Sequence, residues 1–318
     1  MNGQWSLYLV DDAGGDLGAL NGGWSISFST PEYTCQFNPV ASVRSRADFD
    51  GDGKSDFSVF RPSEGNWYLL QSQVGFGAVG WGIGTDTLTP GDYNGDGKTD
   101  FAIFRPNADP SQPDFYILNN GSFTLTGVSW GLAGDIPVIA DYDGDGKSDI
   151  AVYRQSDHTF YILLSGGGII VKPYGVAGDI PVAGDFIGDG KADITLFRPS
   201  TNQWWIFNGA GDTVVQFGQA GDIVVPADYN GDNKDDIAVF RPSTGTWIYQ
   251  PSGGGAGVFI NFGSAGDIPS PGDFDGDGKD DPTIYRNGQW WTLRSTLGVA
   301  VANFGLATDK SILRAYQP

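Results

Sequence analysis

A nonapeptide that recurs six times along the chain constrains its fold more than any other feature. DFDGDGKSD begins at Asp48, and related copies begin at Asp92, Asp141, Asp185, Asp228 and Asp273, at spacings of 44, 49, 44, 43 and 45 residues. Each copy leads into a short apolar run that ends in arginine, such as FSVFR, and then into an aromatic run, such as NWYLLQ. Repeats of about 40–50 residues with four short strands each are typical of a β-propeller.

The strand pattern within one unit supports an all-β fold. In the third unit we expect strands over residues 137–141, 149–154, 159–164 and 169–173. Apolar and small side chains alternate in the second strand of each unit, as in a half-buried strand. The small residues at one position of that strand would let neighbouring sheets pack closely: Ser58, Ala102, Ala151, Thr195, Ala238 and Thr283. No stretch has a sustained helical period.

The two ends of the chain bear on the number of blades. The segment ATDKSILRAY (307–316) aligns with AGDIPVIADY (133–142), so the chain stops after what resembles a seventh inner strand. A hairpin from residues 5–10 and 24–28 could supply the outer strands of that seventh blade. We therefore expect seven blades, six complete and one composite; six blades with a separate N-terminal hairpin is the alternative. The expected domains are residues 1–35, a hairpin, and 36–318, the propeller.

The recurring loop carries metal-ligand chemistry. Counted from its first aspartate, the first copy has carboxylates at positions 1, 3, 5 and 9, while the lysine at position 7 offers only its backbone carbonyl. Gly51 and Gly53 permit the positive φ of a tight loop. Carboxylates this close repel one another unless a cation is bound. An all-oxygen, flexible loop fits Ca²⁺ better than Mg²⁺, and zinc would need His or Cys, of which the chain has one each.

An EF-hand is the obvious competitor, because its loop opens in the same way. That loop needs a bidentate Glu at position 12 and flanking helices. Position 12 is aliphatic in all six copies: Val59, Ile103, Val152, Leu196, Val239 and Ile284. The EF-hand interpretation therefore fails, and the aspartate at position 9 is expected to supply the closing ligand.

The predicted cofactor is Ca²⁺, at about six sites. The expected ligands are Asp48, Asp50, Asp52, Lys54, Asp56; Asp92, Asn94, Asp96, Lys98, Asp100; Asp141, Asp143, Asp145, Lys147, Asp149; Asp185, Asp189, Lys191, Asp193; Asp228, Asn230, Asp232, Lys234, Asp236; and Asp273, Asp275, Asp277, Lys279, Asp281. Ile187 offers no oxygen, so the fourth site should be the weakest. Six bound Ca²⁺ would bring the formal net charge from −20 to −8. The alternative is that the loops are metal-free Asx turns.

Arginines and tryptophans also recur in equivalent places. They are Arg61, Arg105, Arg154, Arg198, Arg241 and Arg286, and Trp67, Trp204, Trp205, Trp247, Trp290 and Trp291. One interpretation is a ring of sugar-stacking aromatics; the other, favoured by their equivalence, is packing between blades with arginine stacked on aromatics or capping carbonyls. Insertions at 107–113 and 251–257 break the repeat and are better binding candidates. His158 is expected in a turn.

The composition of the chain argues against several classes of protein. The chain has 38 acidic and 18 basic residues, whereas nucleic-acid binding needs a basic face. No apolar run approaches the ~18 residues of a membrane span. Cys35 is the single cysteine, so an intrachain disulfide is excluded, and the residues after Met1 do not resemble a signal peptide.

Residues 48–286 resemble tandem FG-GAP/VCBS-type repeats, as in integrin α-subunit heads and many bacterial secreted proteins. The resemblance implies a Ca²⁺-bearing propeller in which the metal loop joins the first two strands of each blade. It implies adhesion or ligand binding more often than catalysis, at an extracellular or cell-surface location. Residues 2–28 resemble the last two strands of a P-domain jelly roll; only that tail is present, so the protease-associated function is not expected to transfer.

The expected function is a non-catalytic, calcium-stabilised module for extracellular binding or adhesion, with a glycan or a protein as ligand. One alternative is a polysaccharide hydrolase or lyase; against it, the acid clusters are already assigned to calcium, and only Glu32 and Glu64 remain as glutamates. The other is a structural subunit that self-associates by strand exchange.

Overall fold

The computed structural model describes residues 46–109 and 111–316. The chain divides into two compact units, 1–40 and 41–318, and all described residues belong to the second. The expected N-terminal hairpin and the expected domain boundary near residue 35 lie outside the described residues. Within the described part, no helix has the length and apolar character that crossing a membrane requires.

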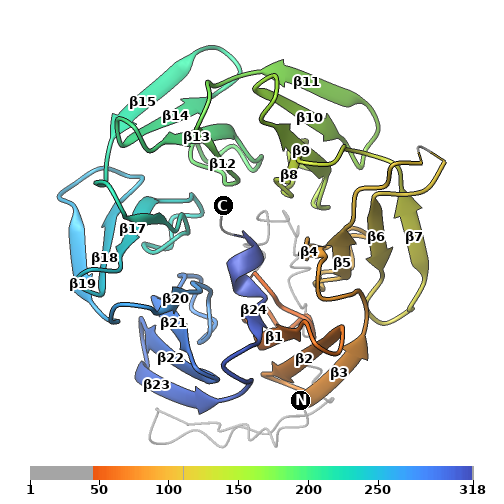
Figure 1. The fold of residues 1–318 in the computed structure, drawn as a ribbon. Helices are drawn as coiled ribbons and strands as arrows, with labels where there is room; N and C mark the ends of the chain where they lie inside the picture. Colours follow the sequence, from red (N-terminus) through yellow and green to blue (C-terminus); the bar gives the residue numbers. More distant parts are fainter. Residues whose placement is uncertain (1–45, 110, 317–318) are drawn as a thin grey trace, which may run out of the picture. The chain divides into compact units, whose positions relative to one another are not determined.

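Six four-stranded antiparallel sheets, the blades, form a ring in the described residues (Figure 1). Blade 1 comprises β24 (Lys310–Ser311), β1 (Phe57–Arg61), β2 (Asn66–Gln71) and β3 (Gly75–Gly80). Blade 2 comprises β4 (Thr87–Leu88), β5 (Phe101–Phe104), β6 (Phe115–Leu118) and β7 (Leu125–Val128). Blade 3 comprises β8 (Ile136–Pro137), β9 (Ile150–Arg154), β10 (Thr159–Leu163) and β11 (Ile169–Pro173).

The other three blades repeat this order from the innermost strand outward. Blade 4 comprises β12 (Ile180–Val182), β13 (Ile194–Arg198), β14 (Gln203–Phe207) and β15 (Asp212–Gln216). Blade 5 comprises β16 (Ile223–Val224), β17 (Ile237–Arg241), β18 (Thr246–Gln250) and β19 (Val258–Asn261). Blade 6 comprises β20 (Ile268–Pro269), β21 (Thr283–Arg286), β22 (Gln289–Arg294) and β23 (Gly298–Asn303). A short 3₁₀ helix, η1 (Leu313–Tyr316), follows β24.

The preferred expectation of seven blades is wrong, and the described residues have the six blades of the alternative. The C-terminal segment does form an inner strand, but β24 pairs with β1, with Val59 opposite Ser311 and Phe60 opposite Lys310. In blade 1 the inner-strand position is taken by β24, from the far end of the propeller, whereas blades 2 to 6 take theirs from the residues just before their own aspartate-rich loop. The ring is closed inside blade 1 by strands from both ends of the propeller, and no seventh sheet is needed.

Within each blade, burial explains why the sequence forms these strands. The second strands are buried along nearly their whole length, whereas the outermost strands, such as β3 and β11, alternate between exposed and half-buried residues. The expected small residues of the second strands are all buried, from Ser58 to Thr283, as close sheet packing requires. The inner strands are shorter than expected: β8 ends at Pro137, and beyond it an isolated bridge joins Ala140 to Asp149.

The core consists of apolar clusters that include side chains from adjacent blades. Trp67, Trp204, Trp247 and Trp290 occupy equivalent places in the third strands of their blades and are fully buried. Trp67 donates its indole N–H to the carbonyl of Trp81, and Trp247 and Trp290 make the equivalent bond. These four tryptophans are therefore packing residues, and their faces are closed to a sugar.

Candidate metal centres

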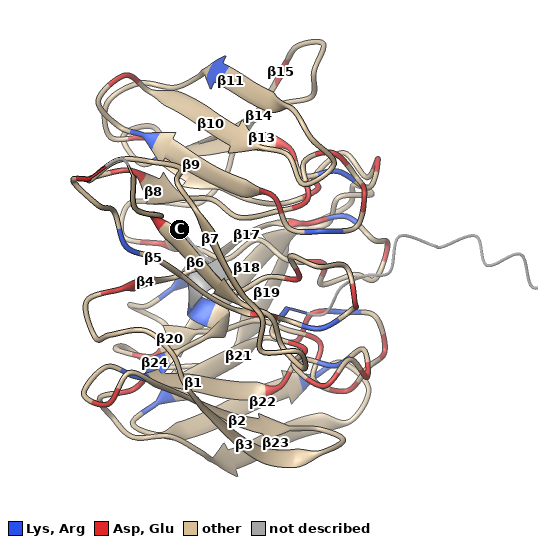
Figure 2. Cartoon of the chain, turned by 90° about the vertical axis from the view of Figure 1, so that its right-hand side faces the viewer, with Lys and Arg blue, Asp and Glu red and all other residues tan. Residues whose placement is uncertain are grey.

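The six aspartate-rich loops lie between the inner and second strand positions of their blades. In blades 2 to 6 the loop joins those two strands directly, as expected; in blade 1 it leads into β1, while β24 comes from the other end of the chain. Figure 2 shows acidic and basic residues of these loops gathered along one side of the propeller. The metal-loop positions below are numbered 1 to 9 from the first aspartate of each loop.

The aspartates at positions 1 and 9 organise the backbone of each loop. In loop 1, Asp48 accepts hydrogen bonds from the N–H groups of Gly51 and Gly53 at 2.7 and 2.8 Å. Both glycines have positive φ, 79° and 86°, which a tight turn of this kind requires. Asp56 accepts from the N–H groups of Phe49 and Ser72, both at 2.8 Å. The position 1 bonds recur in all six loops.

The carboxylates at positions 1, 3 and 9 converge in three loops. The clusters are Asp48, Asp50 and Asp56; Asp141, Asp143 and Asp149; and Asp273, Asp275 and Asp281. In each, one oxygen per carboxylate lies within 4.8 Å of the others. These are the three loops in which position 3 is an aspartate. Asn94 and Asn230 hold position 3 in loops 2 and 5, and Ile187 holds it in loop 4.

At position 3, two of the aspartates have a buried carboxylate oxygen that accepts no hydrogen bond from the described residues. Asp50 Oδ2 accepts bonds from the N–H groups of Gln73 and Val74, but its Oδ1 is buried and has no hydrogen-bond partner among the described residues. Asp275 Oδ1 is in the same condition. A buried carboxylate oxygen without a donor is costly unless a cation neutralises it. The donor set, all oxygen, fits a hard divalent cation.

The predicted ligands at positions 5 and 7 have additional roles. Asp52 at position 5 accepts from the hydroxyl of Ser72 at 2.6 Å and from the N–H of Lys54 at 3.0 Å. Asp52 does not belong to the converging cluster of loop 1. A Cβ added to Gly51 would lie 3.2 Å from Cγ of Lys98, so the position 7 lysine passes over the position 4 glycine of the preceding loop.

That lysine–glycine packing recurs in every loop and was missed by sequence reasoning. The pairs are Gly51–Lys98, Gly95–Lys147, Gly144–Lys191, Gly188–Lys234, Gly231–Lys279 and Gly276–Lys54. The last pair joins blade 6 to blade 1. The recurrence of lysine at position 7 in all six copies, where only its carbonyl was expected to matter, was the available signal.

Backbone hydrogen bonds link the six loops into a closed belt. The N–H at position 8 of each loop donates to the carbonyl at position 1 of the preceding loop, over 2.6 to 2.8 Å. Thr99 donates to Asp48 in this way, and Ser55 donates to Asp273 to complete the circle. Because these bonds join backbone atoms of different blades, side-chain patterns gave no sign of them. The first aspartate of each loop is thus fixed by the next blade.

Burial makes the loop carboxylates difficult to ionise without a cation. Burial, followed by repulsion from neighbouring aspartates, raises the pKa of position 9, against the lowering effect of backbone N–H groups. The pKa rises to about 7 at Asp56, Asp193 and Asp281, and to about 6 at Asp100 and Asp236. The pKa of Asp48 at position 1 is also raised, chiefly by burial. These are the electrostatics of a site that a cation would complete.

The recurring arginines form ion pairs rather than an open sugar-binding ring. Each donates from Nε and Nη2 to both oxygens of an aspartate just before the inner strand, as Arg154 does to Asp135 at 3.0 and 2.8 Å. The aspartates are Asp86, Asp135, Asp179, Asp222, Asp267 and Asp309. Arg61, Arg154 and Arg198 also stack on an aromatic ring. Sequence reasoning missed these aspartates, although their repetition was visible.

The repeat-breaking segments are loops in the structure. In the first, Asn107 Nδ2 donates to the carbonyl of Pro113 at 3.0 Å, across the insertion between β5 and β6. The second, at 251–257, joins β18 to β19, where Gly254 N–H donates to the carbonyl of Pro251. His158 lies in the turn before β10 with a φ of 57°, as expected of a turn residue.

The sequence profile of the FG-GAP-like repeat matches residues 48–103, 92–152 and 185–239, together about half of the chain. The chain belongs to the FG-GAP-like repeat family. The expected resemblance to FG-GAP repeats is thereby confirmed, and five of the six aspartate-rich loops lie within the matched residues. All six loops, which share one pattern, are called FG-GAP loops below. A search of characterised proteins finds no match to this FG-GAP chain.

Solved structures similar to this FG-GAP propeller include the BBS1 N-terminal domain in complex with ARL6, at 13% identity and a TM-score of 0.47, covering 82% of this chain and 80% of the other. Virginiamycin B lyase from Staphylococcus aureus matches at 10% identity and a TM-score of 0.46, covering 82% and 88%. A streptogramin B lyase matches at 10% identity and 0.43, covering 70% of each chain. Likeness at this level carries no functional argument.

Proposed function

We propose that this protein is a non-catalytic, calcium-stabilised binding module that acts outside the cell or at its surface, with a glycan or a protein as ligand. The observation that carries the calcium part is the buried, unpartnered oxygen of Asp50 and of Asp275 beside two further carboxylates. Membership of the FG-GAP family favours a binding function. The closed belt of loops would hold the propeller rigid while a ligand binds.

Calcium is the cation that the loops fit best. The proposed ligands are the oxygens of positions 1, 3, 5 and 9 and the carbonyl of position 7, all of them hard oxygen donors. Flexible loops with this many oxygens suit the six to eight ligands of Ca²⁺ better than the strict octahedron of Mg²⁺. When bound, the cation would neutralise the converging carboxylates. Loop 4, with Ile187 at position 3, fits it least.

With the loop aspartates assigned to calcium, Glu64 and the arginine-paired aspartates support binding rather than catalysis. A glycosidase needs a carboxyl that is protonated near neutral pH beside a second, free one. Glu64, the glutamate of the described residues, accepts from the hydroxyl of Tyr68 at 2.5 Å, and this bond lowers the pKa of Glu64. The aspartates outside the loops that pair with arginines are held by two hydrogen bonds each. The pairing of β24 with β1 within one chain also favours a closed module over strand exchange.

Thermal unfolding in excess calcium, in excess magnesium and with a chelator tests the calcium part. We expect the melting temperature to be highest in calcium, because a cation that binds only the folded state stabilises it by mass action. Native mass spectrometry then counts the bound ions. Equal melting curves in calcium and chelator would refute the metal assignment. A glycan array combined with a reducing-sugar assay tests whether the protein binds a glycan without cleaving it. Binding without release of sugar supports the proposal, and release of reducing ends would contradict it.

A further inference from the structure

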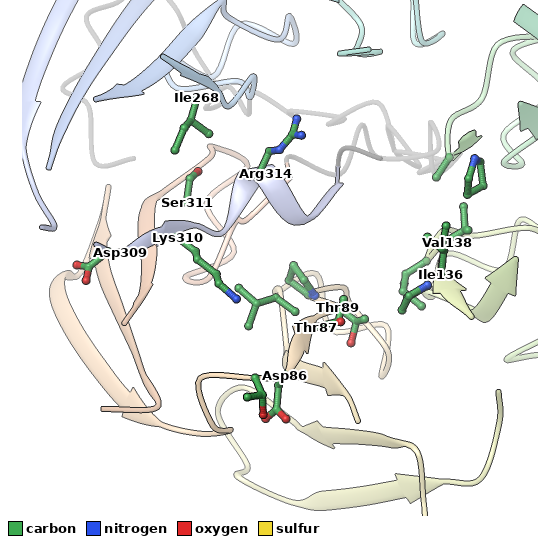
Figure 3. A pocket seen from close by; sticks show the side chains of 17 residues that line it. Asp86, Thr87, Thr89, Ile136, Val138, Ile268, Asp309, Lys310, Ser311 and Arg314 are labelled. Carbon is green, nitrogen blue, oxygen red and sulfur yellow. The ribbon is translucent and has the colours of Figure 1, made fainter. Parts of the chain in front are cut away.

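A cavity of about 630 Å³ lies at the centre of the propeller, away from the FG-GAP loop ligands. Its walls come from the inner strands of several blades and from the segment around η1 (Figure 3). Much of the lining is apolar: Leu88, Ile136, Val138, Pro181 and Ile268. A cavity of this size accommodates a small organic molecule, and an apolar wall with a few polar groups is typical of ligand sites.

Two cations line this cavity, and both break the repeat. Lys310 occupies a place that is apolar or threonine in the other units, which have Thr87, Ile136, Ile180, Ile223 and Ile268. In the sequence alignment of the repeats, Arg314 falls where the units have glycine or alanine before the first aspartate: Ala47, Gly91, Ala140, Gly184, Ala227 and Gly272. The packing of the repeated blades does not require a cation at either position, so a different role must account for Lys310 and Arg314.

The closure of blade 1 explains how an arginine comes to lie here. Ile312 N–H donates to the carbonyl of Ser58, so the C-terminal segment follows the inner-strand path up to that residue. Asp56 N–H then donates to the carbonyl of Ala47, which takes the next place on the path. The C-terminal segment turns away into η1, and Arg314 lines the central cavity instead of packing in a blade.

Arg314 is half-buried and has no counter-ion among the described residues. Its Nη1 is buried and has no hydrogen-bond partner among the described residues. Two carboxylates line the cavity, but both are engaged elsewhere, since Asp86 is held by Arg105 and Asp309 by Arg61. Burial lowers the pKa of Arg314, and no described carboxylate offsets this effect. Thr89, which is 2% exposed and also lines the cavity, has a second unpartnered polar atom, Oγ1.

We propose that the central cavity is a binding site for a small organic anion, a carboxylate with an apolar body, whose charged group pairs with Arg314. A guanidinium and a carboxylate form paired, charge-assisted hydrogen bonds, and buried charges in proteins are normally paired in this way. Lys310 extends toward β4 (Figure 3) and adds positive charge to the same cavity. This site is separate from the FG-GAP loops and does not depend on the calcium proposal.

Octanoate and 1-octanol form a matched pair of probes, because they differ in charge and share the apolar chain. Titration calorimetry of the full chain in excess calcium should give one octanoate per chain, bound at least tenfold more tightly than octanol. Arg314→Met should weaken octanoate binding about 10- to 100-fold, the range for charge-assisted hydrogen bonds, and leave octanol unchanged. Arg294→Met removes an arginine that does not line the cavity and should change neither.

A second readout separates a ligand-binding arginine from a structural one. Without octanoate, Arg314→Met should melt at the same temperature as the parent protein or higher, because it removes a half-buried charge that has no counter-ion. Arg314→Lys, which keeps the charge, should retain part of the octanoate affinity and serves if the methionine variant does not fold. Equal affinity for octanoate and octanol, unchanged octanoate binding by Arg314→Met, or no binding would overturn the proposal. So would sulfate binding as tightly as octanoate, which would indicate a simple ion site.

Discussion

Arg61 and Asp309 are 248 residues apart in sequence, yet they form the same paired ion bridge that every other blade makes locally. Arg61 donates from Nε and Nη2 to the two carboxylate oxygens of Asp309 at 2.9 and 3.0 Å. The equivalent partners in the other blades are 19 residues apart, as in Arg154 and Asp135. The bridge therefore belongs to the repeat, but in blade 1 it joins the start of the propeller to its end.

Replacing Asp309 should loosen the closure of the ring. The Asp309 side chain is buried, and Asp309→Ala would leave Arg61 only its longer contact to Glu64 at 3.6 Å, at a cost of about 2–4 kcal/mol in the free energy of unfolding. Asp135→Ala is the matched control, since it breaks the same bridge inside blade 3. We expect similar losses by denaturant unfolding, but faster amide exchange over residues 310–313 only in the Asp309 variant. Equal exchange there in both variants would contradict a special role in closure.

The contrast between these two bridges also indicates what the sequence could predict. The blade pattern, the loop positions and the small packing residues depend on spacing within one repeat, and all were predictable. The segment 307–316 was rightly expected to contain an inner strand, β24, but its last four residues form η1 instead. The partner of β24, β1, could not be inferred, because pairing over such a distance has no local signal. The blade count failed for that reason.

The candidate metal site also has some features that the sequence could predict and others that it could not. The ligand-type oxygens of Asp48, Asp50 and Asp56 were predictable, because their spacing in the loop brings them together. The belt of backbone bonds, such as Thr99 N–H to the carbonyl of Asp48, was not predictable, because any residue type can make it. The role of Arg314 was not predictable either: its departure from the repeat is visible in the sequence, but its place in the central cavity follows only from the turn of the chain into η1.

The dependence of stability on pH should differ with and without calcium. The pKa of Asp56, Asp193 and Asp281 is about 7 in the folded protein, against 3.8 as the ordinary value. The folded state therefore binds more protons than the unfolded state between about pH 4 and 7, and the free energy of unfolding falls as pH rises through this window. We expect this fall in chelator and its weakening in excess calcium, which competes with protons for the same oxygens. Denaturant unfolding at a series of pH values measures both.

A reciprocal exchange at position 3 tests the unpartnered oxygens. Asp50→Asn gives loop 1 the residue that loops 2 and 5 already have, and it should weaken that calcium site about tenfold, since affinity follows ligand charge. In chelator the variant should be at least as stable as the parent protein, because it removes an unpaired buried charge. Asn94→Asp should do the opposite in loop 2. Calcium titration followed by tryptophan fluorescence measures both; affinities that do not change in opposite directions would contradict position 3 as a ligand.

The fourth loop offers a gain-of-function test. Ile187 stands where the other loops have an oxygen, and it is 37% exposed, so its replacement sacrifices little packing. Its backbone N–H already donates to Asp193 at 3.1 Å, which places residue 187 beside the position 9 carboxylate. Ile187→Asp should therefore complete the donor set and raise the number of Ca²⁺ ions bound per chain by one at concentrations below about 10⁻⁴ M, the affinity range of weak extracellular sites.

Ile187→Ala removes the same apolar side chain without adding an oxygen and should leave the number unchanged. Native mass spectrometry across a calcium series distinguishes the two, and an equal count in both variants would mean that position 3 does not bind the cation in this loop.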